Sequence, residues 1–354
     1  MTVFDGRAPR SEVAGRSARR SPVPAAAGQD ILVTGASGML GGGVARALAA
    51  RGDRVTVLQR RPSGLGLPEV LTDVADRAAV RAAVRGRDAV VHLAARVGVS
   101  GTWPEFARAN VTGTDTIVQT CQDLGVPRLV HISSPSVAHA GSALVGVGAT
   151  PADPDHAGGH YARSKALAEQ IALAADGEQL RVLALRPHLV WGPGDTQLVG
   201  RIVDRARRGS LPVLGSGAAL IDSTYVDNAV DAIVAALDRL EQVHGRALVV
   251  SNGEPRPIAE LIAAICLAGG APPPDRHLPV SLGRAAGGAV EAVWALRRAL
   301  GRPAAGDPPM TRFVADQFST AHWFDQRQTQ ELLDWRPAVS LDTGFRRLAE
   351  WYAS

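Results

Sequence analysis

Lysine is almost absent from this sequence. Of its 38 lysine and arginine residues, only Lys165 is a lysine. An arginine is a planar and permanently charged fork, whereas a lysine is a compact charge that suits a neighbouring hydroxyl group. We therefore expect Lys165 to have a specific role.

Long apolar runs, cysteine motifs and basic clusters are missing as well. No uninterrupted apolar run reaches the roughly 18 residues that a membrane span needs. Cys121 and Cys266 have no C-x-x-C partner and no histidine at ligand spacing, which predicts reduced core residues in a cytoplasmic protein and no metal site. The net charge of +4 comes from scattered arginines without interleaved aromatics, so we expect no nucleic-acid partner.

Short apolar strands alternate with helical segments through the first half of the chain. This pattern predicts an α/β fold with a Rossmann-like, doubly wound parallel sheet, whose ligands bind beyond the carboxyl ends of the strands. The expected strands are 31–33, 55–58, 70–71, 89–95 and 128–132, and the expected helices are 44–51, 76–85, 104–124 and 161–176.

A glycine-rich turn joins the first strand to the first helix. Gly35, Gly38 and Gly41 have the spacing G-x-x-G-x-x-G rather than G-x-G-x-x-G. Backbone N–H groups and the helix dipole at such a turn can bind the pyrophosphate of a dinucleotide. The alternative is an ordinary glycine turn between core elements.

The residues after the second strand bear on the choice of dinucleotide. NAD enzymes usually have an acid there that binds the ribose 2′-hydroxyl, but this chain has Arg60 and Arg61, which suit the 2′-phosphate of NADP. The alternative is that both arginines are solvated loop charges. Asp73 could contact the adenine amine or cap the helix 76–85.

Tyr161 and Lys165 stand four residues apart at the start of an Ala-rich helix, so their side chains share one face. A nearby ammonium lowers the pKa of a phenol, which predicts a general acid or base. Ser134 follows the strand 128–132 and falls on the same edge of the sheet. No G-x-S-x-G elbow surrounds it, which argues against acyl transfer and in favour of a group that binds a carbonyl oxygen.

These motifs together resemble the extended short-chain dehydrogenase/reductases over about residues 30–354. The resemblance rests on Thr34 to Gly41, Asn110, Ser133-Ser134-Pro135, Tyr161 with Lys165, and Leu185-Arg186-Pro187 before Trp191-Gly192-Pro193-Gly194. It implies that Tyr161 is the acid/base, that Lys165 binds the nicotinamide ribose, that Ser134 binds the substrate oxygen and that Asn110 supports the lysine. The cofactor contacts that it implies are Gly35, Ser37, Gly38, Met39, Leu40, Gly41, Arg60, Arg61, Asp73, Val74, Leu93, Ala94, Ala95, Lys165, Pro187, His188 and Val190.

The resemblance also implies a domain organisation. We expect residues 1–29, with five arginines and no apolar periodicity, to be a disordered basic tail. We expect an NADP-binding Rossmann domain at 30–194, to which segments near 220–250 return, and a smaller C-terminal substrate-binding domain, mainly 195–354. Tyr225-Val226-Asp227-Asn228 is expected to be architectural.

Within the family, the chain is most similar to bacterial 2-alkyl-3-oxoalkanoate reductases of olefin biosynthesis, in a branch that also contains 3β-hydroxysteroid dehydrogenases. This implies NADPH-dependent reduction of a long-chain 2-alkyl-3-oxoalkanoate to the 3-hydroxy acid. The alternatives are a sterol dehydrogenase, an NAD-dependent nucleotide-sugar epimerase and a non-catalytic NADP sensor. Epimerases usually have V-Y-G where this chain has Val137-Ala138-His139, which weakens the sugar hypothesis.

Two features of the sequence bear on its partners. The segment 282–300 is either a buried helix or an apolar, lipid-facing helix through which a long apolar substrate enters, and it is too short to span a bilayer. By resemblance we expect a homodimer, formed by helices 104–124 and 161–176, and partner enzymes of a pathway.

Overall fold

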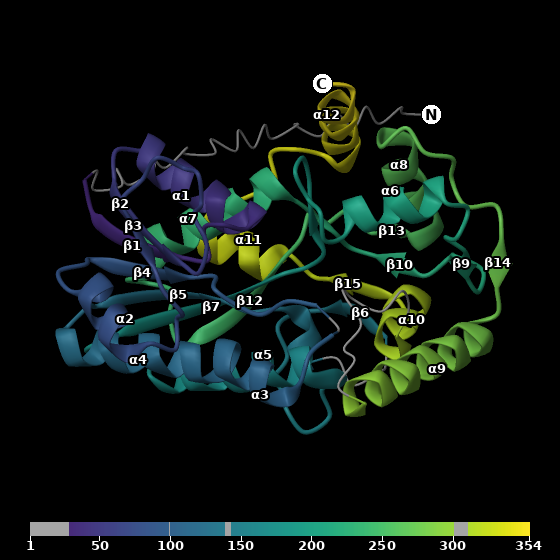
Figure 1. Ribbon diagram of the computed structural model, residues 1–354. Coiled ribbons are helices and arrows are strands. Elements are labelled where there is room, and N and C mark those ends of the chain that lie inside the picture. The colour runs from purple at the N-terminus through teal and green to yellow at the C-terminus, as the bar shows by residue number, and fades with distance from the viewer. Residues whose placement is uncertain (1–27, 99, 139–142, 301–310) are drawn as a thin grey trace, which may run out of the picture.

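The computed structural model describes residues 28–98, 100–138, 143–300 and 311–354 (Figure 1). A seven-stranded sheet with the order β12-β7-β5-β4-β1-β2-β3 forms the centre of one half of the molecule. Each neighbouring pair of its strands is parallel, as the sequence predicted. The strands are β1 (Asp30–Thr34), β2 (Arg54–Gln59), β3 (Glu69–Leu71), β4 (Ala89–His92), β5 (Arg128–Ile132), β7 (Arg181–Pro187) and β12 (Arg246–Val250).

Helices cover both faces of this sheet, so its central strands are buried on both sides and read as continuous apolar runs. Ile31, Leu32 and Val33 of β1, for example, are fully buried. One face carries α1 (Met39–Ala50), α7 (Val226–Arg239) and α11 (Arg327–Leu333), and the other carries α2 (Arg77–Val84), α4 (Gly113–Leu124) and α5 (Gly159–Ala174) (Figure 1). The doubly wound architecture is therefore confirmed.

Helix α7 returns to the first sheet from the second half of the chain, as expected. A side chain on Gly43 of α1 would collide with Val230 of α7, so the two helices approach closely. Asn228 is fully buried and donates to Asn252 Oδ1 (2.9 Å) and to the Val339 carbonyl (2.7 Å). The Tyr225–Asn228 segment thus has an architectural role.

The second half of the molecule contains a four-stranded sheet with the order β13-β10-β15-β6. Its strands are β13 (Arg256–Pro257), β10 (Leu220–Ile221), β15 (His322–Phe324) and β6 (Leu144–Val147). Two small sheets pair β8 (Val190–Trp191) with β11 (Thr224–Tyr225) and β9 (Val213–Leu214) with β14 (His277–Leu278). The helices here are α6 (Val199–Arg207), α8 (Ile258–Ala268), α9 (Val280–Ala299), α10 (Arg312–Ser319) and α12 (Leu341–Ala353), and a 3₁₀ turn, η2 (Pro135–Ala138), follows β5.

Three local expectations need correction. Strand β6 lies within 30–194 but pairs with β15 of the second half. The helix expected at 104–124 consists of α3 (Trp103–Phe106), a π-helix η1 (Ala107–Thr112) and α4. Gln29, which we assigned to the tail, bonds to Asp53 and Arg128; residues 1–27 and His139 lie outside the described residues. Among the helices that the structure describes, we find none that could cross a membrane.

Candidate active site

A cavity of about 1090 Å³ lies at the carboxyl ends of the parallel strands and extends to the second half of the molecule. All the predicted site residues except Asn110 line it. They are Gly35, Ser37, Gly38, Met39, Leu40, Gly41, Arg60, Arg61, Asp73, Val74, Leu93, Ala94, Ala95, Ser134, Tyr161, Lys165, Pro187, His188 and Val190. The strand ends of the seven-stranded sheet, together with α5 and β8, thus bring together residues that are up to 155 positions apart, from Gly35 to Val190.

The glycine turn packs closely against neighbouring backbone of the protein and could not carry side chains at Gly35 and Gly41. Gly35 has a φ of +78°, and a Cβ there would lie 2.8 Å from the Ala94 backbone nitrogen. A Cβ on Gly41 would collide with the carbonyl group of Gly35. Gly38 caps α1 without any side-chain hydrogen bond, so the positive end of this helix faces the cavity. These residues fit the pyrophosphate of a nicotinamide dinucleotide.

Charged side chains gather at the end of the cavity next to β2. Arg60 and Arg61 are exposed there. Burial raises the pKa of Asp73, but the hydrogen bonds from Ala75 and Arg108 outweigh it and leave the pKa lowered. Sequence reasoning missed Glu69, whose Oε1 accepts hydrogen bonds from the Gln59 side chain and from the backbone and hydroxyl of Ser63. Glu69 does not line the cavity itself, and the pairing of β3 with β2 places it beside Gln59, which does.

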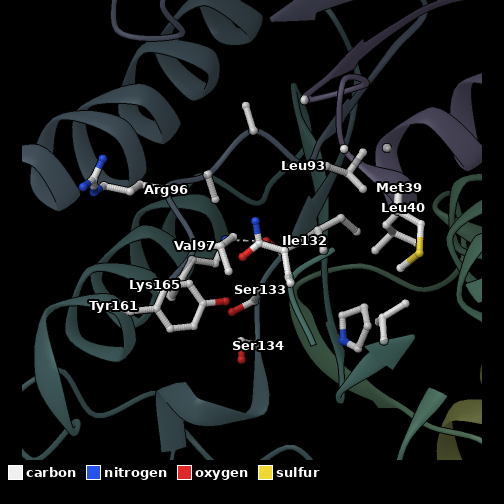
Figure 2. A pocket seen from close by; sticks show the side chains of 18 of the residues that line it. Met39, Leu40, Leu93, Arg96, Val97, Ile132, Ser133, Ser134, Tyr161 and Lys165 are labelled. Atoms are coloured by element: carbon white, nitrogen blue, oxygen red, sulfur yellow. Dashed lines mark hydrogen bonds between the residues drawn. The ribbon is translucent and has the colours of Figure 1, made fainter. Parts of the chain in front are cut away.

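The hydroxyl of Tyr161 points toward Ser133 and Ser134 (Figure 2). Ser134 hydrogen-bonds to the phenol and lies 3.0 Å from the hydroxyl of Ser136. The Ser133 hydroxyl is buried and has no hydrogen-bond partner among the described residues, so it is available to a ligand. We had not singled out Ser133; its place directly before Ser134 on the strand exit was the available signal.

The pKa of Tyr161 differs from our expectation. We expected the ammonium of Lys165 to lower it. Instead burial raises the pKa of Tyr161, and the hydrogen bond with Ser134 offsets only part of this effect. The phenol is therefore protonated near neutral pH, which is the form that donates a proton.

Lys165 is buried, with 3% of its surface exposed, and its ammonium donates to the carbonyl group of Ile132 at the end of β5. Burial lowers the pKa of Lys165 to about 8, although the Glu169 carboxylate acts in the opposite direction. An ammonium with this pKa can release a proton close to physiological pH.

Asn110 does not line the cavity but supports the helix that carries the pair. Its Oδ1 accepts from the Arg96 backbone (2.7 Å), and its Nδ2 donates to Ser164 Oγ (2.8 Å). Ser164 in turn donates to the Tyr161 carbonyl (2.8 Å). These bonds fix the first turn of α5, so Asn110 positions Tyr161 through the backbone; its support of Lys165 itself stays a prediction.

The end of the cavity in the second half contains both apolar side chains and the polar side chains of Asp195, Thr196, Gln197 and Gln317, and sequence reasoning identified only His188 there. Its walls include Leu144, Leu189, Phe318, His322 and Phe324. The ring of His188 packs edge-on against that of Phe324, with centroids 5.1 Å apart. These residues come from β6, β15, α10 and the segment between β7 and β8, and no local pattern in the sequence predicts that these segments lie together.

Known proteins are similar to this chain in both sequence and fold. The profile of the NAD dependent epimerase/dehydratase family matches residues 31–251. A 2-alkyl-3-oxoalkanoate reductase of Stenotrophomonas maltophilia (strain K279a) is 40% identical over 328 residues, which are 90% of this chain and 98% of that protein. A decarboxylating sterol-4-alpha-carboxylate 3-dehydrogenase of Mus musculus is 28% identical over 333 residues, which are 90% of this chain and 89% of that protein.

Among solved structures, MoeE5 in complex with UDP-glucose and NAD superimposes with a TM-score of 0.68 and 27% identity, over 92% of this chain and 98% of that chain.

The geometry of the phenol leads to a first prediction. Replacing Tyr161 by Phe should lower kcat by at least about 100-fold, because the proton donor is lost. The dissociation constant of the nicotinamide cofactor, measured by fluorescence titration, should change by less than about twofold, because the ring remains. As a matched control, Tyr352→Phe in α12 lies outside the cavity and should keep full turnover. Near-normal turnover of Tyr161→Phe would exclude the phenol as the proton donor.

The pKa of Lys165 leads to a second prediction. With a pKa of about 8, the side chain carries its proton below this value and loses it above. The kcat/KM for carbonyl reduction should therefore be level at low pH and fall by about tenfold per unit above about pH 8. In a Lys165→Arg variant, the charge persists and this decline should disappear, whatever the absolute rate. A wild-type profile without an alkaline decline would contradict the assignment.

Proposed function

Because the chain belongs to the NAD-dependent epimerase/dehydratase family of extended short-chain dehydrogenase/reductases, and is thus an oxidoreductase, we propose that it reduces a 2-alkyl-3-oxoalkanoate with NADPH. The product would be the 3-hydroxy acid. The observation that carries this proposal is the apolar wall of Leu144, Leu189, Phe318 and Phe324 in the same cavity as the phenol of Tyr161. The name of the 40% identical relative supports the same substrate class.

The charges of the cavity argue against a nucleotide sugar. A diphosphate needs cations beside it, but between Pro187 and Phe324 no described lining residue is an arginine or lysine. Asp195 lies there, in the segment before α6, where its Oδ1 accepts from the backbone of Gln197 and Leu198. Arg96 lines the cavity but points away from Tyr161 (Figure 2). A long alkyl chain suits such a wall better than a sugar diphosphate does.

The protonation of the phenol favours the reductive direction. NADPH, when bound, supplies the hydride. Tyr161, protonated because burial raises its pKa, donates a proton to the carbonyl oxygen, which Ser134 holds by a second hydrogen bond. Lys165 binds the ribose and returns a proton to the phenolate. Oxidation would require the phenolate at the start, which burial disfavours.

The choice of NADPH over NADH rests on Arg60 and Arg61, which border the cavity beyond β2. Two guanidinium groups suit a 2′-phosphate, and Glu69, the acid nearby, already accepts three hydrogen bonds. We also propose a cytoplasmic location, in keeping with two cysteines that are buried and unpaired.

A sterol dehydrogenase is the second candidate, because the mouse relative carries that name and the apolar wall would also suit a sterol. Steady-state rates with NADPH and a long-chain 2-alkyl-3-keto acid should exceed those with NADP and a 3β-hydroxysterol by at least about tenfold in kcat/KM. The reverse order would favour the sterol. Cofactor binding without any turnover on either substrate would contradict both and indicate a sensor.

The cofactor preference can be tested separately. Replacing both Arg60 and Arg61 by Ala should raise the KM for NADPH by at least about tenfold and change that for NADH by less than about threefold. A matched control, Arg46→Ala in α1 together with Arg85→Ala just after α2, removes two exposed charges outside the cavity and should leave the ratio unchanged. If the Arg60→Ala, Arg61→Ala variant raised the KM for NADPH and for NADH equally, these arginines would not bind the 2′-phosphate.

A further inference from the structure

Helix α9 has large apolar side chains on its solvent side as well as on its inner side. Val290 and Trp294 are half-buried, but Leu282 is 57% exposed, Leu296 60% and, just after the helix, Leu300 65%. The face that packs on the protein contains Gly283 and Gly287, where a Cβ would collide with Leu214 and with the backbone of Thr311 and Arg312. An apolar stripe normally faces the core of the protein. The apolar stripe on the solvent side of α9 is therefore available to another molecule.

The exposed residues form one continuous stripe, which we call the α9 stripe. At 100° per residue they fall within about 120° of the helix circumference, along a length of about 27 Å. The stripe consists of Leu282, Ala285, Ala286, Ala289, Ala292, Val293, Leu296 and Leu300. Exposed apolar patches of this kind mark interaction sites.

Polar contacts fix the rotation that turns the stripe outward. Arg284 Nε donates to Asp316 Oδ1 of α10 at 2.6 Å, and the backbone of Arg312 donates to Glu291 Oε1 at 2.9 Å. Both α9 residues lie on the side of the helix opposite the stripe. The outward position of the leucines is therefore built into the packing of α9 against α10. In Figure 1, α9 runs along the outer edge of the molecule beside α10.

The charges around the stripe favour an anionic partner. Residues 275–300 contain four arginines and two acids. Arg284 is paired with Asp316 on the opposite side of α9, whereas Arg276 and Arg297 are exposed and Arg297 lies beside the stripe on the helix surface. An apolar stripe with an exposed arginine at its edge suits a helix that lies in the interface of an anionic bilayer.

Helix α10 connects this face with the catalytic cavity. It packs along α9 and contributes Gln317 and Phe318 to the cavity wall. A bilayer under α9 would thus lie next to the apolar end of the cavity, on the side from which a long alkyl chain has to come. This step depends on the proposed function, whereas the surface itself does not.

We propose that the α9 stripe docks the protein on the surface of an anionic lipid bilayer, with α9 parallel to the membrane plane. The leucines and Val293 insert between the acyl chains near the headgroups, and the arginines contact lipid phosphates. The enzyme then takes up its long-chain keto acid from the bilayer through the end of the cavity lined by Phe318.

Flotation of the full-length protein with vesicles tests this without any substrate. Wild type should float with vesicles of phosphatidylcholine and phosphatidylglycerol, and several-fold less with phosphatidylcholine alone or in high salt. Leu296→Glu should weaken flotation by at least about tenfold. Leu267→Glu is the matched control, because Leu267 is 65% exposed on α8, outside the stripe, and should float like wild type. Both variants should reduce a short, soluble keto substrate at the wild-type rate, which shows that they are folded.

Four results would overturn the proposal. If the wild-type protein does not float with the vesicles, lipid docking is excluded. If Leu296→Glu floats as well as the wild type, the contact with lipid lies outside the α9 stripe. Binding without preference for phosphatidylglycerol removes the role of the arginines. A wild-type dimer in light scattering that Leu296→Glu makes monomeric, together with no flotation, would assign the stripe to a second copy of the chain. None of these results bears on the reductase activity, which is measured separately.

Discussion

The burial of one ammonium group is the constraint on which the site depends. Lys165 is almost fully shielded from water, so its charge has to be compensated inside the protein. The Ile132 carbonyl at the end of β5 accepts from it, and Glu169, one turn along α5, adds an opposite charge. Glu169 is itself held by Arg186 of β7, which also donates to the Thr150 carbonyl (2.7 Å). The catalytic helix, two central strands and the segment before α5 are thus joined around one charge.

The features that the sequence predicted are those that depend on neighbours along the chain. The spacing of Tyr161 and Lys165 fixes their common face wherever the helix lies, and the glycines from Gly35 to Gly41 define a turn by themselves. The missed features need contacts between distant segments. Glu69 meets Gln59, which lines the cofactor end, only because β3 pairs with β2, and Leu144 reaches the other end only because β6 pairs with β15. The pKa of Tyr161 depends on burial, which no spacing reveals.

The cavity combines two chemistries that come from different parts of the chain. Its cofactor end is built from backbone N–H groups, glycines and charged side chains at the strand ends of the first sheet. Its other end is built from Leu189, Phe318 and Phe324, which belong to loops and short elements around the second sheet. The reacting carbonyl has to lie where these meet, beside Tyr161. The same cofactor chemistry can therefore serve other substrates when only the second set of residues changes.

The π-helix between α3 and α4 has a consequence for how this protein tolerates changes in length. A π turn contains one residue more than a regular turn, and each residue rotates a helix by about 100°. If the same residues formed a regular α-helix, either Asn110 would turn away from Ser164 or Ile117 and Cys121 would turn away from the sheet by about 100°. The wide turn absorbs one residue, so one helical stretch meets both angular requirements. Inserting a further residue here should therefore damage the site more than deleting one, because a deletion restores regular geometry and leaves the flanking turns in the same orientation.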